Sequence, residues 1–217
     1  FCGFLAEYQL DHKIEKDRER KYIHTFIEDL KTDTANIHRV LLFRKQKSER
    51  MDSLMLYLSS GQTKGHESEL YFFDRTLNRT ARFINNDRTI TQLKNSGSLR
   101  LISNEQAADS MMGYQQLVET IHMNQEDDRI ERRATDPVLS KIFNPYVFDK
   151  MVNLVGVDRP IDNPPLRSYD PAIHQDLAFY VHQLKGSNFI LQSRLGQLEK
   201  KAINLINLLR KEYRIKD

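Results

Sequence analysis

The sequence predicts an all-α protein, an elongated helical bundle in which long N- and C-terminal helices run antiparallel after a helical stalk. Two observations support this prediction. Apolar residues recur at alternating steps of three and four near both ends of the chain, which places them on one face of a helix. In addition, no stretch shows the alternation of apolar and polar residues that is typical of a strand.

The composition is that of a folded protein exposed to solvent. Of the 217 residues, 39% are hydrophobic and 29% are charged. The 33 Lys and Arg residues are interleaved with 30 Asp and Glu residues, so we expect no surface of a single sign and no nucleic-acid partner. Cys2 is the single cysteine, which excludes an intrachain disulfide and a cysteine-based zinc site.

The first residues change character from apolar to charged. Residues 1–6 are an uncharged apolar stub, which we interpret as the end of a transmembrane helix lying mostly upstream of Phe1. Two alternatives stay open: the stub could be a frayed start packed on a neighbouring helix, and Cys2 could carry a lipid. Residues 7–22 are mostly charged, with pairs at helical spacing, and predict a solvent-exposed helical stalk.

Residues 23–217 are predicted to form the bundle domain, beginning with an apolar seam on the first long helix. Thr34, Arg44 and Ser48 interrupt this seam, and residues 32–34 (Thr-Asp-Thr) could break the helix because Thr and Asp compete for backbone hydrogen bonds. A matching seam follows the last helix, which is predicted from Pro171 to about Tyr213. The candidate interface or packing seam is Ile23, Ile27, Leu30, Ile37, Leu41, Met51, Met55, Leu191, Leu198, Leu205 and Leu209.

Shorter helices are predicted between the two long ones. Residues 68–84 predict a helix whose inner face carries Leu70, Phe73, Leu77, Ala81 and Ile84. Residues 89–94 predict a second, short helix, capped from residues 85–87.

A longer middle helix is expected after a capping box. Ser103 precedes Gln106 by three residues, which indicates a helix start at that point. Residues 125–133 are nearly all charged, which we interpret as a solvated helix end or loop. The residues of this helix expected to face inward are Ala107, Met111, Tyr114, Val118 and Ile121.

Proline positions mark the remaining helix starts. Asp136-Pro137 and Asp170-Pro171 each combine a capping Asp with a Pro in the first turn. Asn144-Pro145 separates two short helices, and an irregular connection is expected over residues 154–170.

The sequence contains no recognisable catalytic pattern. No two of its seven histidines stand three or four residues apart, the spacing of a helical zinc pair. Glycine-rich phosphate loops and the Gly-x-Ser-x-Gly turn of hydrolases do not occur. We therefore predict no catalytic residue, no metal ligand and no cofactor. Aromatic clusters such as Tyr71-Phe72-Phe73 and Phe143 with Phe148 fit a core better than a ligand pocket between helices.

Two segments carry a resemblance. Residues 28–33 (Glu-Asp-Leu-Lys-Thr-Asp) and 91–102, with Leu-Lys-Asn-Ser-Gly-Ser-Leu-Arg-Leu-Ile at the end, resemble an uncharacterised family of single-span membrane-anchored proteins from Bacteroidetes-type bacteria. The resemblance implies the bacterial inner membrane, with the domain on the periplasmic side. The basic residues within 13–21 favour the cytoplasm instead by the positive-inside rule.

From these features we predict a non-enzymatic, membrane-anchored helical interaction or scaffold module, a subunit or accessory of a membrane-associated assembly. Its partner would be another protein or a second copy of the chain. The alternative is an extracytoplasmic sensor domain that transmits a ligand signal through its membrane helix.

Overall fold

The computed structural model describes residues 2–216, and for residues 2–8 it describes the helical backbone alone. The side chains of the predicted stub over residues 1–6, Cys2 included, therefore lie outside the described residues. Among the described residues, no helix combines the length and the apolar character needed to cross a membrane.

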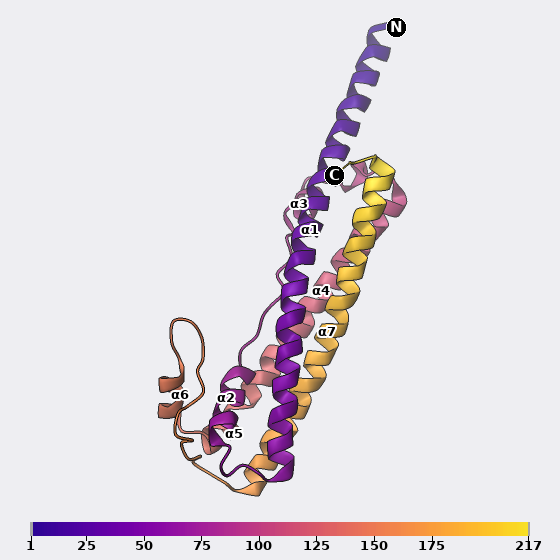
Figure 1. Cartoon of the computed structure of the whole chain (residues 1–217). Coiled ribbons are helices and arrows are strands. Elements are labelled where there is room, and N and C mark those ends of the chain that lie inside the picture. The colour runs from indigo at the N-terminus through magenta and orange to yellow at the C-terminus, as the bar shows by residue number, and fades with distance from the viewer. Residues whose placement is uncertain (1, 217) are drawn as a thin grey trace. The chain divides into compact units, whose positions relative to one another are not determined.

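The described residues are all-α, as predicted (Figure 1). No strand occurs between residues 2 and 216, where Val152 and Val157 form an isolated antiparallel bridge. The helices are α1 (Cys2–Ser60), α2 (Glu67–Leu77), α3 (Arg88–Asn95), α4 (Glu105–Ala134), α5 (Asp136–Ile142), α6 (Pro145–Met151) and α7 (Pro171–Tyr213), with a 3-10 turn, η1 (Ser98–Leu101), after α3.

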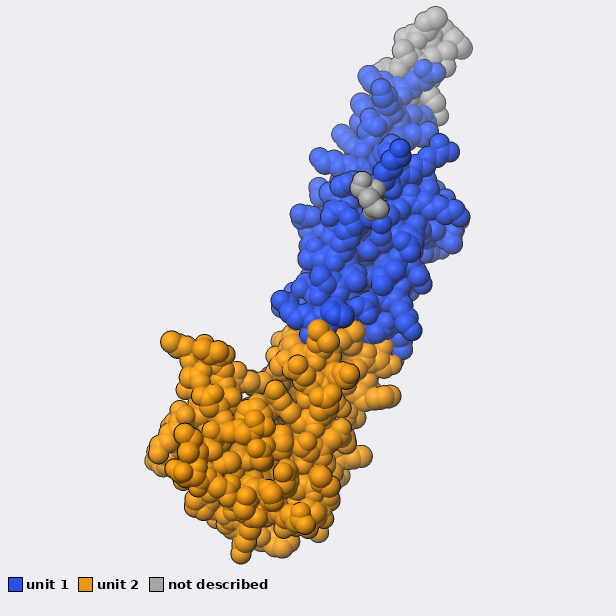
Figure 2. All heavy atoms as spheres, viewed as in Figure 1, with its two compact units in different colours: residues 1–39, 83–121, 194–217 blue, residues 40–82, 122–193 orange. Residues whose placement is uncertain are grey.

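The chain divides into two compact units, which Figure 2 shows in different colours. Unit 1 comprises residues 1–39, 83–121 and 194–217, and unit 2 comprises residues 40–82 and 122–193. The long helices α1, α4 and α7 contribute residues to both units. The predicted bundle domain over residues 23–217 is thus divided between them.

In unit 1, α1 and α7 run antiparallel. Glu19, early on α1, accepts a hydrogen bond from the Tyr213 hydroxyl at the end of α7, at 2.6 Å. His38, later on α1, has its Nδ1 3.8 Å from Oε1 of Glu199, which comes earlier on α7. Residues 9–18 of α1 are all exposed, and buried positions begin at Glu19. The buried apolar residues of α1 and α7 here include Ile23, Phe26, Ile27, Leu30, Ile37, Leu195, Leu198, Ala202, Leu205 and Leu209.

The helix α1 is continuous through residues 32–34, so the predicted break is wrong. The Thr32 hydroxyl donates to the carbonyl oxygen of Glu28 at 3.0 Å, and the Thr34 hydroxyl donates to that of Leu30 at 2.8 Å. These bonds to carbonyls one turn earlier leave the helical backbone bonds in place. The competition expected from Asp33 does not occur, because its carboxylate is engaged elsewhere.

Asp29 and Asp33 on α1 hold the segment that leads into α3. Asp33 accepts hydrogen bonds from the backbone N–H of Asn86 at 2.6 Å and from the Tyr114 hydroxyl at 2.7 Å. Asp29 accepts one from the backbone N–H of Thr89 at 3.0 Å. A carboxylate of α1 thus caps α3, where the sequence predicted a cap from the residues just before that helix.

The helix α4 begins with a different cap from the one predicted. Asn104 Oδ1 accepts a hydrogen bond from the backbone N–H of Ala107 at 2.9 Å, whereas the Ser103 hydroxyl donates to the Glu19 carboxylate at 2.9 Å. The capping-box pattern located the helix start and assigned the wrong residue. All five residues predicted to face inward on this helix are buried: Ala107, Met111, Tyr114, Val118 and Ile121.

The helix α2 ends at Leu77, well before the predicted end at Ile84. The guanidinium of Arg132 donates a hydrogen bond to the carbonyl oxygen of Asn78 at 3.2 Å. The chain beyond Asn78 is not helical until α3. Ile84, expected on the inner face, is 73% exposed, and Phe83 is buried instead.

In unit 2, one apolar cluster joins α1, α2, α5, α6 and α7. The ring of Tyr71 lies 5.1 Å from that of Phe143 and 5.4 Å from that of Phe148, measured between centroids, so these aromatic residues belong largely to the core. The buried members are Met51, Leu54, Leu70, Tyr71, Phe73, Leu77, Val138, Leu139, Ile142, Phe143, Met151, Leu166, Leu177, Val181 and Leu184.

The helices that begin at prolines have the predicted N-cap residues, with one exception. Asp170 Oδ1 accepts a hydrogen bond from the backbone N–H of Ala172 at 2.9 Å and caps α7, as predicted. Asn144 separates α5 from α6, also as predicted. At α5 the N-cap residue is Thr135, and Asp136 is the first helical residue. The face of α7 that carries the predicted seam residues Leu191, Leu198, Leu205 and Leu209 is buried throughout, and its other buried residues are Leu177, Leu184, Leu195 and Ala202.

Candidate functional site

The predicted seam is used for packing inside each unit. The residues of the candidate seam that are buried are Ile23, Ile27, Leu30, Ile37, Met51, Leu191, Leu198, Leu205 and Leu209. Leu41 and Met55 are half-buried, because at alternate seam positions beyond Ile37 the residue one place earlier is buried instead, while Arg44 and Met51 are buried where predicted. The buried residues of the seam there are Val40, Arg44, Lys47, Met51 and Leu54. Steps of three and four fit a helix in either order, so spacing alone could not decide between the two registers.

Two fully exposed aliphatic side chains, Leu154 and Val155, lie on the loop that follows α6. This segment, residues 152–161, is called the apical loop below, and Figure 1 shows it projecting from the short helices of unit 2. Asn153 Oδ1 accepts hydrogen bonds from the backbone N–H groups of Val155 and Gly156, each at 2.8 Å. The apex is therefore a closed turn that presents both side chains to solvent.

The base of the apical loop is attached to the start of α2. The Ser68 hydroxyl donates to the carbonyl oxygen of Pro160 at 2.8 Å, and the Ser68 backbone N–H donates to Asn163 Oδ1 at 2.8 Å. Arg159 forms an ion pair with Glu69, with 2.7 Å between Nε and Oε1. Because the loop is held at its base and closed at its apex, it can bind a partner without the free-energy cost of ordering the loop.

The Glu67 carboxylate joins three segments of the chain next to the base of the apical loop. Its carboxylate accepts hydrogen bonds from the Tyr169 hydroxyl at 2.7 Å, from the Gly65 backbone N–H at 2.8 Å and from the Asn163 side-chain amide. Burial by itself raises the pKa of Glu67, but the three hydrogen bonds favour the ionised form and hold the pKa below its ordinary value. Asn163 has φ of +48°, a left-handed conformation that Asn tolerates better than most residues.

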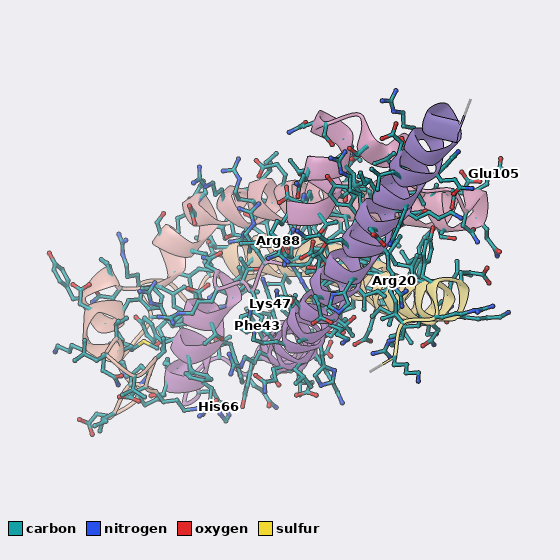
Figure 3. The ribbon with its side chains drawn as sticks, turned by 90° about the horizontal axis from the view of Figure 1, so that it is seen from above. Arg20, Phe43, Lys47, His66, Arg88 and Glu105 are labelled. Carbon is teal, nitrogen blue, oxygen red and sulfur yellow. The ribbon has the colours of Figure 1, made fainter. Side chains whose placement is uncertain are left out.

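Arg44, Lys47 and Asp128 are buried inside unit 2, and together with the partly buried Arg132 they form what is called the buried ionic cluster below; Figure 3 labels Lys47 on α1. Nη1 of Arg44 is 3.7 Å from Oδ1 of Asp128 and donates a hydrogen bond to Asn188 Oδ1 at 3.1 Å. Nε of Arg132 donates to Oδ2 of Asp128 at 3.0 Å. The cluster thus contains three cationic side chains and one carboxylate.

Several donors of the buried ionic cluster have no hydrogen-bond partner in the protein. They are Nε and Nη2 of Arg44 and Nζ of Lys47. Burial lowers the pKa of Lys47 to about 8; Asp128 opposes this effect, and the neighbouring arginines add to it. Burial also lowers the pKa of Arg44. Because unpaired buried charge is costly, we infer that the cluster lowers the stability of unit 2.

A buried carboxyl group adjoins a pocket of about 240 Å³ between α2, α5 and α6 in unit 2. Asp74 is 3% exposed, and its Oδ1 has no hydrogen-bond partner in the protein. Burial raises the pKa of Asp74 to about 8, against the effect of Arg75 and with a smaller contribution from Asp136. Phe143 and Phe148 form an aromatic wall of this pocket.

The sequence contained signals for these residues that were not used. Arg44 stands on the predicted seam, which indicated a buried cation. Asp74 stands four residues after Leu70 and three before Leu77, on the same helical face. Asp128 lies in the charged run that was predicted to be solvated, and that prediction is wrong for this residue, which is 1% exposed.

Compared with known proteins, the chain matches no family model, no curated protein and no solved structure. The class that the fold defines is therefore the general one of all-α helical-bundle proteins. Within the described residues, no group of three or more His, Cys, Asp or Glu side chains is placed to hold a metal ion.

Proposed function

We propose that the protein is a helical interaction module of a membrane-associated assembly and that the apex of the apical loop is its contact surface. The observation that supports this proposal is the full exposure of Leu154 and Val155 on a turn that is already ordered. Aliphatic surface in water is unfavourable by about 25 cal/mol per Å², which an apolar pocket on a partner would recover.

The partner proposed is a protein with an apolar pocket and a polar rim. Asp158 and Arg159 follow the apex and would meet such a rim, in the usual arrangement of a protein interface. The seam residues of α1 and α7 cannot supply this contact, because most of them are buried within the units.

Attachment to a membrane is proposed from the beginning of the chain. The apolar residues 1–6 are followed by the charged segment 7–22, and residues 9–18 of that segment are exposed on α1. An exposed charged helix of this kind would act as a spacer between an anchor and the buried part of unit 1. The resemblance noted for residues 28–33 and 91–102 likewise implies a membrane anchor.

Site-specific photo-crosslinking of the full chain in its native membranes tests the contact surface. A photoreactive residue at Val155 should give a discrete protein adduct, whereas the same group at the exposed Gln62 of unit 2 should not. The adduct should be lost when Leu154→Ser is added. A product that contains a second copy of the chain would identify self-association. The proposal is wrong if position 155 gives no protein adduct or gives lipid adducts alone.

A further inference from the structure

The pocket beside Asp74 contains charged groups of both signs. Asp74 and Asp136 contribute carboxyl groups, and Arg75 and Arg167 contribute guanidinium groups. The Arg167 side chain also donates a hydrogen bond to the carbonyl oxygen of Ser140, another residue of the pocket wall. A ligand that carries a single charge would be attracted by one pair and repelled by the other.

Two buried polar atoms beside the pocket lack partners, and they differ in kind. Oδ1 of Asp74 is an acceptor, and Nε of Arg75 is a donor; neither has a hydrogen-bond partner in the protein. Both atoms are buried, and no protein group replaces the hydrogen bonds that they make to water in the unfolded chain, which is rare for buried polar groups. A molecule with a donor at one end and an acceptor at the other would satisfy both.

The rest of the wall is apolar. Leu139, Phe143 and Phe148 line the pocket, and the guanidinium carbon of Arg75 lies 5.9 Å from the centre of the Phe148 ring. The volume of about 240 Å³ is below that of a drug-sized site, which is commonly about 300 Å³ or more. The pocket therefore suits a small molecule with an apolar body.

We propose that this pocket binds a free α-amino acid with an apolar side chain, its ammonium group on Asp74, its carboxylate on Arg75 and its side chain against Phe143 and Phe148. The site is independent of the apical loop. It would serve the ligand-responsive role that the sequence offered as the alternative function.

Proton release distinguishes this mode of binding from adsorption to the surface. With a pKa of about 8, the Asp74 carboxyl is mostly neutral at a pH of about 7. An ammonium group placed on it favours the ionised form, so binding should release a proton to the buffer. Calorimetry in buffers of different ionisation enthalpy measures that proton directly.

The experiment is a titration of the full chain with L-phenylalanine, compared with phenethylamine, which lacks the carboxylate, and 3-phenylpropionate, which lacks the ammonium group. We expect the amino acid to bind at least about tenfold more tightly than either comparator and to release close to one proton. Asp74→Asn, which keeps the size of the side chain, should weaken binding by at least about tenfold and abolish proton release. Asp149→Asn, an exposed control on α6, should change neither.

If circular dichroism shows that Asp74→Asn is misfolded, a second variant still tests the proposal. Arg75→Gln should remove the preference for L-phenylalanine over phenethylamine while leaving phenethylamine binding in place. The proposal is overturned if neither L-phenylalanine nor L-leucine binds at about 10 mM, or if Asp74→Asn binds L-phenylalanine as tightly as the unmodified chain does. It is also overturned if phenethylamine and 3-phenylpropionate bind as tightly as L-phenylalanine.

Discussion

Replacing Lys47 by Met should stabilise unit 2 near neutral pH. Lys47 is 3% exposed, its Nζ has no hydrogen-bond partner in the protein, and two arginines of the buried ionic cluster lie nearby. Methionine keeps an unbranched apolar side chain of similar length and removes the charge. The substitution therefore removes an unfavourable term without leaving a large cavity.

The magnitude follows from the pKa of the ammonium group. Burial lowers the pKa of Lys47 from 10.5 to about 8, a difference of about 2.5 pKa units. At about 1.36 kcal/mol per pKa unit, the charged form is less stable in the folded chain by roughly 3 kcal/mol. The pKa of about 8 already includes the attraction of Asp128, so the expected gain in unfolding free energy is about 3 kcal/mol.

The pH dependence has a definite sign. Because the folded pKa of Lys47 is below the unfolded value, the destabilisation is complete below a pH of about 8 and disappears as the pH rises toward 10.5. Urea unfolding of both chains between pH values of about 6.5 and 9.5 measures this difference. The gain should be constant up to about pH 7.5 and then shrink with rising pH.

Lys45→Met is the matched control, because Lys45 is a neighbouring exposed lysine on the same helix. It should change the unfolding free energy by less than about 0.5 kcal/mol at every pH. The reasoning is refuted if Lys47→Met lowers stability near neutral pH, or if its effect does not change between about pH 7 and 9.5.

Three further substitutions test the remaining buried groups. Asp74→Asn should raise the unfolding free energy at a pH of about 8.5 by on the order of 4 kcal/mol, and by much less at about pH 4. The reason is that the raised pKa of Asp74 makes its contribution to the stability of the folded chain fall as the pH rises from 3.8 to about 8. Urea unfolding at both pH values measures the two differences. Glu67→Gln should lower stability by about 1 to 3 kcal/mol at neutral pH and accelerate proteolysis of the apical loop. Its effect should diminish as the pH falls below 4.5, since the pKa of Glu67 is held below that value. Asp33→Asn should weaken the hydrogen bond that the Asp33 side chain accepts from the backbone N–H of Asn86, before α3. Hydrogen exchange at the Asn86 amide should then be faster than in the unmodified chain.

Periodicity was sufficient to predict the helices that are long and amphipathic. The helix α7 and the inner face of α4 follow directly from the spacing of their apolar residues. Periodicity could not decide the register of the seam beyond Ile37, where Val40 and Lys47 are buried in place of Leu41 and Ser48. A step of three followed by four and a step of four followed by three both fit the helix, and the choice depends on the facing helices.

Helix caps were predicted less well, because caps here depend on tertiary contacts. Asp29 of α1 caps α3, and Glu19 of α1 takes the hydroxyl of Ser103, so that Asn104 caps α4. A local pattern such as the capping box finds a helix end but cannot see a carboxylate that approaches from a distant part of the chain. Asp170, which has no such competitor, caps α7 as predicted.

The candidate sites depend on residues whose environment is not local. Asp74 and Lys47 stand at apolar positions of their helices, and the sequence alone gave no partner for either. The exposure of Leu154 and Val155 follows from the turn that Asn153 closes. A Leu-Val pair in a connection between helices is equally compatible with burial, so its exposure could not be predicted from the sequence.

The most direct test of the proposed contact surface is a photo-crosslinking scan of the apical loop, residues 152–161, in the full chain in native membranes. The yield of protein adducts should peak at positions 154 and 155, which are fully exposed and apolar, and should be lower at the polar Asn153 and Asp158. A yield that is the same at every position, or no protein adduct at any of them, would contradict the proposed function.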